Sequence, residues 1–305
     1  MLNDNLKSYL HLHLIVFIWG FTAILGELIT LDALPLVWYR MLLAVGFIAL
    51  YFLWNKKSFK VSPKLFGVLL FLGLIIALHW LTFFKAIKVS NVSVTLACLS
   101  TGAFFAAFLE PIFYKRRVIW YEILFGLMVV GGLYMIFNFE GDYVFGIVLA
   151  LISAFLSALF SVFNGKLASK YDPGIISIYE LGGGVLCFSV YLLFSGGFSS
   201  SFFDVSGSDW MYLFVLSSIC TAYAFIASVK VMKFISPYTV MLTINLEPIY
   251  GILLALMIFG EKEKMSSGFY FGALIILSTV VLNGLVKYYQ KRKPIKQQDV
   301  SSFSS

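Results

Sequence analysis

Long apolar segments alternate with short polar ones along almost the whole chain. A helix that rises about 1.5 Å per residue needs about 20 apolar residues to cross a hydrocarbon layer about 30 Å thick. Ten windows of that length, bounded by charged residues, proline or glycine, lie at 10–29, 35–54, 65–84, 92–113, 118–137, 144–163, 174–194, 210–229, 237–259 and 268–286. The pattern predicts an all-α integral membrane protein with ten transmembrane helices.

Composition supports a lipid environment. Hydrophobic residues make up 61% of the chain and charged residues 12%, whereas soluble domains have roughly 45–50% and about 25%. The longest connection between windows covers 195–209, so we expect no large domain outside the membrane. The first window carries Trp19 and Glu27 and has no small-residue cleavage site, which favours a helix of the mature protein over a signal peptide. The three cysteines lie inside apolar windows without CxxC spacing, which argues against a disulfide or a metal site.

The net charge of +7 is explained by membrane topology. Cytoplasmic loops of membrane proteins collect Lys and Arg. If the N-terminus is cytoplasmic, 17 of the 22 basic residues fall on the cytoplasmic side, including those of a basic tail at 287–305. We therefore expect a multi-pass protein of the cell (plasma or inner) membrane with both termini cytoplasmic, in contact with the lipid bilayer and with no nucleic-acid partner.

The two halves of the chain share a helix pattern at an offset of 146 residues. This offset pairs the end of the fourth window with the end of the ninth, Phe113 with Phe259. Repeats are then expected at 10–137 and 144–286. Because five is an odd number, the second repeat enters the membrane from the opposite side, which predicts two inverted five-helix repeats (5+5). Such repeats give a physical route to alternating access around a central site.

The ninth window contains the strongest candidate for a binding residue. Glu247 lies near the expected midplane, beside Asn245 and directly before Pro248, whose ring removes a backbone hydrogen bond. The repeat offset places Thr101 and Gly102 at the same depth in the fourth window. We interpret Glu247, Asn245 and Thr101 as substrate- or proton-binding candidates and Pro248 and Gly102 as hinge candidates. The alternatives are that Glu247 is a structural carboxyl bonded to a neighbouring helix and that Pro248 forms a kink needed only for packing.

Two further charges lie at related depths in the two halves. A charge at the bilayer centre costs at least about 2.5–3.5 kcal/mol, so retained charges are candidates for function. Arg40 in the second window and Glu180 in the seventh have opposite signs, which suggests gates or partners. Arg40 is equally consistent with snorkelling to the surface or with an ion pair to Glu27. His79 is a candidate proton relay, with a hydrogen-bonded structural role as the alternative.

Aromatic and small residues complete the set of candidates. Trp19 and Tyr223 lie near mid-depth, where they suit an apolar cavity, although packing alone also explains them. Glycines in the fifth and tenth windows, among them Gly126, Gly132 and Gly272, predict close helix contacts within the scaffold or in a homodimer.

With Trp19-Gly20 in the first window, Pro35 followed by Arg40 in the second, and Gly260-Glu261-Lys262 after the ninth, the chain resembles the EamA-type members of the drug/metabolite transporter superfamily. It departs from their pattern at 114–116, where Tyr-Lys-Arg replaces a Gly-Glu-Arg-like turn. The resemblance implies a central cavity lined mainly by helices 1, 3, 4, 6, 8 and 9, and frequent export of amino acids, metabolites or amphipathic compounds.

Function classes can be ranked from these features. A secondary transporter for a small-molecule solute is favoured, with Glu247 or Glu180 as possible sites of proton coupling, because no GxxxxGK[ST] loop is present. An uncoupled facilitator or exchanger is the alternative, and a membrane receptor or assembly protein is a third class. The chain lacks HExxH and GxSxG, so we expect no enzyme, no catalytic residues, no metal and no cofactor.

Overall fold

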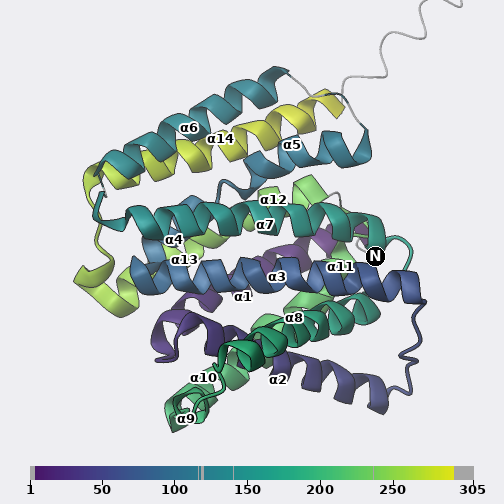
Figure 1. The fold of residues 1–305 in the computed structure, drawn as a ribbon. Helices are drawn as coiled ribbons and strands as arrows, with labels where there is room; N and C mark the ends of the chain where they lie inside the picture. The colour runs from purple at the N-terminus through teal and green to yellow at the C-terminus, as the bar shows by residue number, and fades with distance from the viewer. Residues whose placement is uncertain (1–3, 116, 118–119, 140, 236, 292–305) are drawn as a thin grey trace, which may run out of the picture.

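The computed structural model describes residues 4–115, 117, 120–139, 141–235 and 237–291, and these residues form an all-helical fold (Figure 1). The elements are α1 Asp4–Leu28, α2 Ala33–Trp54, α3 Pro63–Val89, α4 Val92–Leu99, α5 Gly102–Tyr114, α6 Trp120–Phe139, η1 Gly141–Tyr143, α7 Val144–Ala168, α8 Pro173–Ser195, α9 Ser200–Phe203, α10 Gly207–Ser217, the π-helical turn η2 Ser218–Tyr223, α11 Ala224–Val231, α12 Pro237–Ile244, α13 Glu247–Phe259, η3 Gly260–Glu263 and α14 Ser267–Lys291. Most of the basic tail expected at 287–305 lies outside the described residues.

Seven helical segments of the described chain are long and apolar enough to cross a membrane. They are Lys7–Leu28, Ala33–Trp54, Pro63–Val89, Val92–Tyr114, Gly141–Ala168, Pro173–Ser195 and Gly207–Val231. Leu124–Asn138 and Ser267–Thr279 are shorter apolar helices. The all-helical membrane fold expected from the sequence is thus confirmed for the described residues, whereas the count of ten spans remains a prediction.

Three of the apolar windows are not continuous α-helices. The fourth breaks at Ser100 and Thr101, whose hydroxyls bond the carbonyl oxygens of Ala97 and Cys98 in place of a continued helix. The ninth breaks at Asn245 and Leu246, just before Pro248. The eighth contains the π turn η2. Both of the expected hinge candidates, Gly102 and Pro248, therefore lie within two residues of an interruption.

The interruptions in the two halves lie at matching places. α4 and α12 begin at Val92 and Pro237, and α5 and α13 begin at Gly102 and Glu247. Both pairs of residue numbers differ by 145, one less than the offset expected from the sequence.

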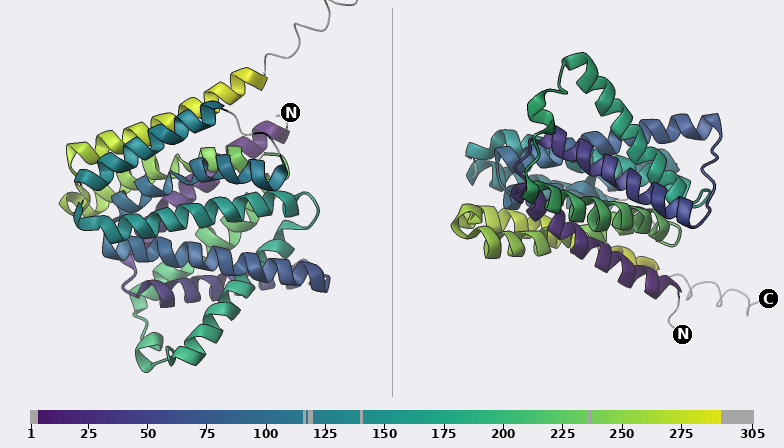
Figure 2. Two further views of the ribbon diagram at one scale, coloured as in Figure 1. Left: turned by 45° about the horizontal axis from the view of Figure 1, so that its top comes forward. Right: turned by 90° about the horizontal axis from the view of Figure 1, so that it is seen from below.

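Helices α6 and α14 form a separate pair on one side of the bundle, side by side in Figure 1 and in the left view of Figure 2. Their backbones approach at two glycines. A Cβ added to Gly132 would lie 2.9 Å from the carbonyl oxygen of Gly272, and one added to Gly272 would lie 2.8 Å from that of Gly132. These two glycines therefore serve contacts within the chain.

The helices run roughly along one direction, so that the bundle has two ends (Figure 1). The start of α1, the end of α14 and the α2–α3 and α7–α8 connections lie at one end, where Lys57 forms an ion pair with Asp172 at 3.6 Å. The α1–α2 and α3–α4 connections lie at the other. There Asp209 accepts hydrogen bonds from Thr30, and Glu263 accepts them from the backbone N–H groups of Val92 and Ser93.

Candidate functional site

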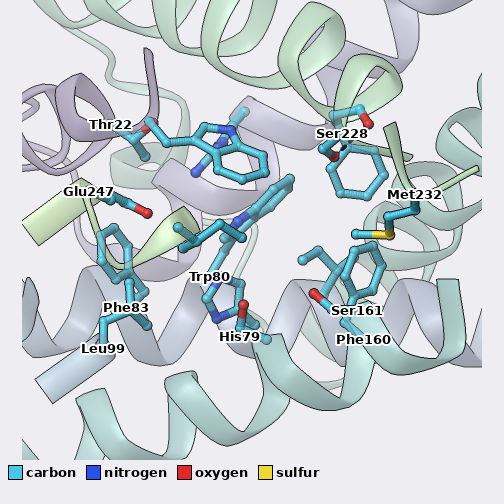
Figure 3. Close-up of a pocket in the computed structure, with 16 residues that line it drawn as sticks. Thr22, His79, Trp80, Phe83, Leu99, Phe160, Ser161, Ser228, Met232 and Glu247 are labelled. Carbon is cyan, nitrogen blue, oxygen red and sulfur yellow. Dashed lines mark hydrogen bonds between the residues drawn. The ribbon is translucent and has the colours of Figure 1, made fainter. Parts of the chain in front are cut away.

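A small cavity lies in the centre of the bundle, among α1, α2, α3, α4, α7, α11, α12 and α13. Its apolar walls are mainly aromatic: Trp19, Trp80, Phe83, Phe160 and Phe225. Its polar side chains are Thr22, Arg40, His79, Ser157, Ser161, Ser228 and Glu247. In Figure 3, Thr22 and Glu247 lie on one side, Ser161 and Met232 on the other, and Trp80 between them. The centres of water molecules can occupy about 70 Å³ of this space, enough for several waters but not for a drug-sized molecule.

Arg40 is the cation of the cavity and is held rigidly. Only 1% of its surface is exposed. Its Nε donates a hydrogen bond to Thr221 Oγ1 at 2.7 Å, and its guanidinium carbon lies 3.9 Å from the centroid of the Trp80 ring. Its Nη1 has no hydrogen-bond partner among the described residues. The expected alternatives for Arg40 are wrong, since it does not snorkel and, within the described chain, forms no ion pair with Glu27. One face of the guanidinium is fixed while one nitrogen is left able to donate.

Glu247 is the carboxyl group of the cavity. It is the first residue of α13, 6% exposed, and within the described ranges its carboxylate has no hydrogen bond and no direct ion pair. Pro248 follows it and has no backbone N–H with which to continue the helix. Glu247 and Arg40 act on each other electrostatically without touching. The cavity therefore carries a guanidinium group and a carboxyl group that a bound molecule can reach.

His79 lines the cavity, and its contacts with Ser153 fix the orientation of its ring. Its Nδ1 lies 2.9 Å from the carbonyl oxygen of Ser153 and 2.8 Å from Ser153 Oγ. The Ser153 hydroxyl donates its own proton to the carbonyl oxygen of His79 at 3.0 Å. Nδ1 must therefore carry a hydrogen, and in the neutral ring Nε2 is a hydrogen-bond acceptor. The histidine is at once structurally bonded and available to a solute.

Four of the sequence candidates thus meet in one cavity: Trp19, Arg40, His79 and Glu247. The other four do not line it. Thr101 bonds within its own chain segment, and Asn245 lies buried at the break before α13. Tyr223 is 45% exposed and bonds His11 on the outside of the bundle. Glu180 is buried elsewhere, against Asn164.

The sequence interpretation missed several cavity residues. Thr22 and Trp80 lie close in sequence to the candidates Trp19 and His79. Ser157 and Ser161 are spaced four residues apart on α7, so they share a face of that helix. Small hydroxyl residues at this spacing in an otherwise apolar helix indicate a polar helix face, and this pattern could have been found in the sequence. The cavity also matches the lining that the resemblance implies, with the addition of Arg40 from the second window.

Within the described ranges, no group of three or more His, Cys, Asp or Glu side chains that could hold a metal ion comes together.

Membrane-length helices around a central cavity lined by buried basic and acidic side chains define a class, the multi-pass membrane transporters. The chain belongs to the EamA-like transporter family, whose model matches residues 6–138 and again 144–285. The family resemblance drawn from the sequence is therefore confirmed.

Relatives and a solved structure agree with this membership. An uncharacterized transporter of Archaeoglobus fulgidus is 24% identical over 285 residues, which cover 91% of this chain and 97% of the relative. The uncharacterized transporter YdfC of Bacillus subtilis is 21% identical over 221 residues, covering 72% of this chain and 69% of the relative. A crystal structure that is 14% identical in sequence superposes with a TM-score of 0.68 over 92% of this chain and 98% of its own, which supports the fold alone.

Proposed function

We propose that this protein is a secondary transporter that exports a small metabolite or amphipathic molecule across the cell membrane, through the central cavity and by alternating access. The observation that carries the proposal is a pair of buried ionisable side chains, one basic and one acidic, that line the same cavity. Arg40 Nη1 and the Glu247 carboxylate face one cavity with no partner among the described residues, although each buried charge is costly in a membrane. A solute that bonds them would offset that cost.

The arrangement of the chain supports the alternating-access part of the proposal. We infer ten transmembrane helices in two inverted five-helix repeats, with both termini cytoplasmic. The family model matches the chain twice, and the interruptions of α4–α5 and α12–α13 recur at a constant spacing. Lys57 and Lys166 lie near the end of the bundle where α1 begins, as the positive-inside rule requires of a cytoplasmic end. In this proposal, the small free volume assigns the structure to a closed state of the cycle.

The test begins with ligand-induced stability. The purified protein is heated in the presence of amino acids, nucleobases, sugars, organic cations and phosphorylated metabolites, and a ligand at 100 times its Kd should add about 2.7 kcal/mol. Glu247→Gln should abolish the shift of an active compound while leaving the unliganded melting temperature within a few degrees of the parent. Glu261→Gln, an exposed carboxylate outside the cavity, is the matched control and should keep the shift.

The same compound is then loaded into liposomes that contain the protein, and its flux is measured. Flux that depends on Glu247 supports transport through the cavity. Binding that depends on Glu247 without any flux would favour a receptor and contradict the proposal.

A further inference from the structure

Glu180 forms a second buried polar site, outside the cavity. It lies about two turns after the start of α8, and Asn164 lies about one turn before the end of α7. Both side chains are 0% exposed, and Asn164 Nδ2 donates a hydrogen bond to Glu180 Oε1 at 3.0 Å. The pair is therefore near the end of the bundle that carries the α7–α8 connection (Figure 1).

Two oxygen atoms of this pair lack partners. Within the described chain, neither Glu180 Oε2 nor Asn164 Oδ1 has a hydrogen bond. Each buried acceptor without a donor costs the full free energy of its desolvation, and here two such acceptors are neighbours. A proton on Glu180 Oε2 removes the charge and converts that oxygen into a donor, and Asn164 Oδ1 is an acceptor on the residue that already binds the other carboxyl oxygen.

No described cation neutralises Glu180 instead. The charged groups of the neighbouring helices have other partners or lie at the surface. Arg40 of α2 bonds Thr221, His79 of α3 bonds Ser153, and Lys166 of α7 bonds the Phe113 carbonyl oxygen. The remaining basic groups of these helices either are exposed or bond elsewhere: Lys64, Lys85, Lys88 and Lys230. On α8 itself, Asp172 pairs with Lys57 and Tyr179 bonds the Phe59 carbonyl oxygen.

Close backbone packing holds α8 against α3 at Glu180, whose carboxyl oxygen Oε2 is buried away from water. A Cβ added to Gly73 of α3 would collide with the carbonyl oxygen of Glu180, and one added to Gly184 would lie 3.0 Å from the carbonyl oxygen of Gly73. An ionised carboxylate can therefore gain water only if α8 moves away from α3 or α7.

Asn164 connects this site to the cavity. Its Nδ2 also lies 3.4 Å from the carbonyl oxygen of Phe160, one turn earlier on α7. Phe160 and the adjacent Ser161 line the cavity. A movement of the end of α7 at Asn164 therefore displaces the cavity wall.

We propose that Glu180 and Asn164 form a proton-binding site, separate from the solute cavity, that holds the ends of α7 and α8 together while Glu180 is protonated. When the ends of α7 and α8 part, water reaches Glu180, its O–H bond breaks, the proton passes to that water, and the bonding electrons remain on the carboxylate. The hydrated carboxylate then keeps α7 and α8 apart, which opens the cavity toward that end. Only this last step, in which proton release is coupled to solute movement, rests on the proposed transport function.

Infrared spectroscopy of the purified protein at neutral pH tests the site without any solute. The parent spectrum minus that of Glu180→Gln should contain the C=O stretching band of one protonated carboxylic acid, shifted in D₂O. Glu247→Gln, at a buried carboxylate of the cavity, should leave this band in place. A difference spectrum with carboxylate bands alone would overturn the proposal, since the deleted group was then ionised.

A second variant covers the case in which Glu180→Gln does not fold. In Asn164→Leu the same band should move to higher frequency, because the carboxyl loses the hydrogen bond from Asn164 Nδ2. An unchanged band would contradict the pairing. A melting temperature that rises when sodium replaces choline in the parent, and not in Glu180→Gln, would identify a sodium site and overturn the assignment of a proton. None of these results depends on whether Glu247 binds a solute.

Discussion

At the scale of single residues, Arg40 and Glu180 bond to local partners and not to each other. Arg40 and Glu180 have opposite signs at related depths, which suggested partners from the sequence. In the structure Arg40 is held by Thr221 and Trp80, and Glu180 by Asn164. Trp80 contributes because a desolvated cation over an aromatic face gains about 2 kcal/mol. Each charge thus keeps part of its bonding capacity for a solute or a proton.

The bond between Arg40 and Thr221 gives a prediction for stability. Thr221→Val removes the acceptor of Arg40 Nε and leaves a buried charged donor unpaired, which should lower the free energy of unfolding by about 1–3 kcal/mol. Thr279→Val is the control, because among the described residues the buried Thr279 hydroxyl bonds only the Ile275 carbonyl oxygen of its own helix. The measurement is thermal unfolding in one detergent. Equal losses in both variants would show that Thr221 does not support Arg40.

At the scale of helices, polar side chains on α7 contact both the central cavity and the Glu180 site. Ser153 bonds His79, Ser157 and Ser161 line the cavity, and Asn164 bonds Glu180. Their spacings of four, four and three residues keep them on one helical face. The hydropathy windows found α7 as a span but did not reveal this face, because serine changes a window average very little.

The contact between α6 and α14 gives a prediction at this scale, with neighbouring glycines as a matched pair. A Cβ at Gly132 would lie 2.7 Å from Ile276 Cγ1 and 2.9 Å from the Gly272 carbonyl oxygen, whereas one at Gly131 would meet nothing within 4 Å. Gly132→Ala should therefore destabilise the protein by about 1–3 kcal/mol. Gly131→Ala should be neutral or stabilising by up to about 1 kcal/mol through helix propensity.

Thermal unfolding of both variants checks this prediction. If Gly131→Ala were the more damaging change, the exposed face of α6 would be a contact between two copies of the chain, and the scaffold interpretation of these glycines would fail.

At the scale of the whole molecule, hydrogen bonds join the two halves at the end of the bundle away from the α7–α8 connection. Glu263 of η3, in the second half, accepts hydrogen bonds from Val92 N at 3.0 Å and Ser93 N at 2.8 Å, in the first half. A carboxylate at a helix start is favoured by the free N–H groups and by the helix dipole.

These hydrogen bonds of Glu263 give a third prediction. Glu263→Gln replaces one acceptor oxygen by an NH₂ group that faces an N–H, so the free energy of unfolding should fall by about 1.5–3 kcal/mol. Glu261→Gln, two residues away and exposed, should change it by less than about 1 kcal/mol. Chemical unfolding in detergent measures both, and a similar small effect in the two variants would show that Glu263 does not hold the halves together.

The proton site gives a fourth prediction, for coupled transport. In liposomes, Glu180→Gln should lose both the exchange of labelled for unlabelled solute and accumulation driven by a pH gradient, because a glutamine cannot release a proton to part α7 from α8. The purified variant should still bind the solute, because the cavity is intact. Glu261→Gln should retain both activities. If Glu180→Gln accumulated solute to the same level as the parent protein, the proton site would not be coupled to transport.

The sequence by itself determined the helices, the membrane environment, the family and the identity of the buried charges, because apolar runs and intramembrane charges are local features of the chain. Only the tertiary structure decided which charges share a cavity. Trp19, Arg40, His79 and Glu247 converge from four helices, while Tyr223 turns outward and Glu180 is enclosed with Asn164. Depth in the membrane follows from position in the sequence, but the direction in which a side chain points depends on how each helix is rotated against its neighbours. That rotation is set by contacts between distant segments, such as those at Gly73 and Gly132.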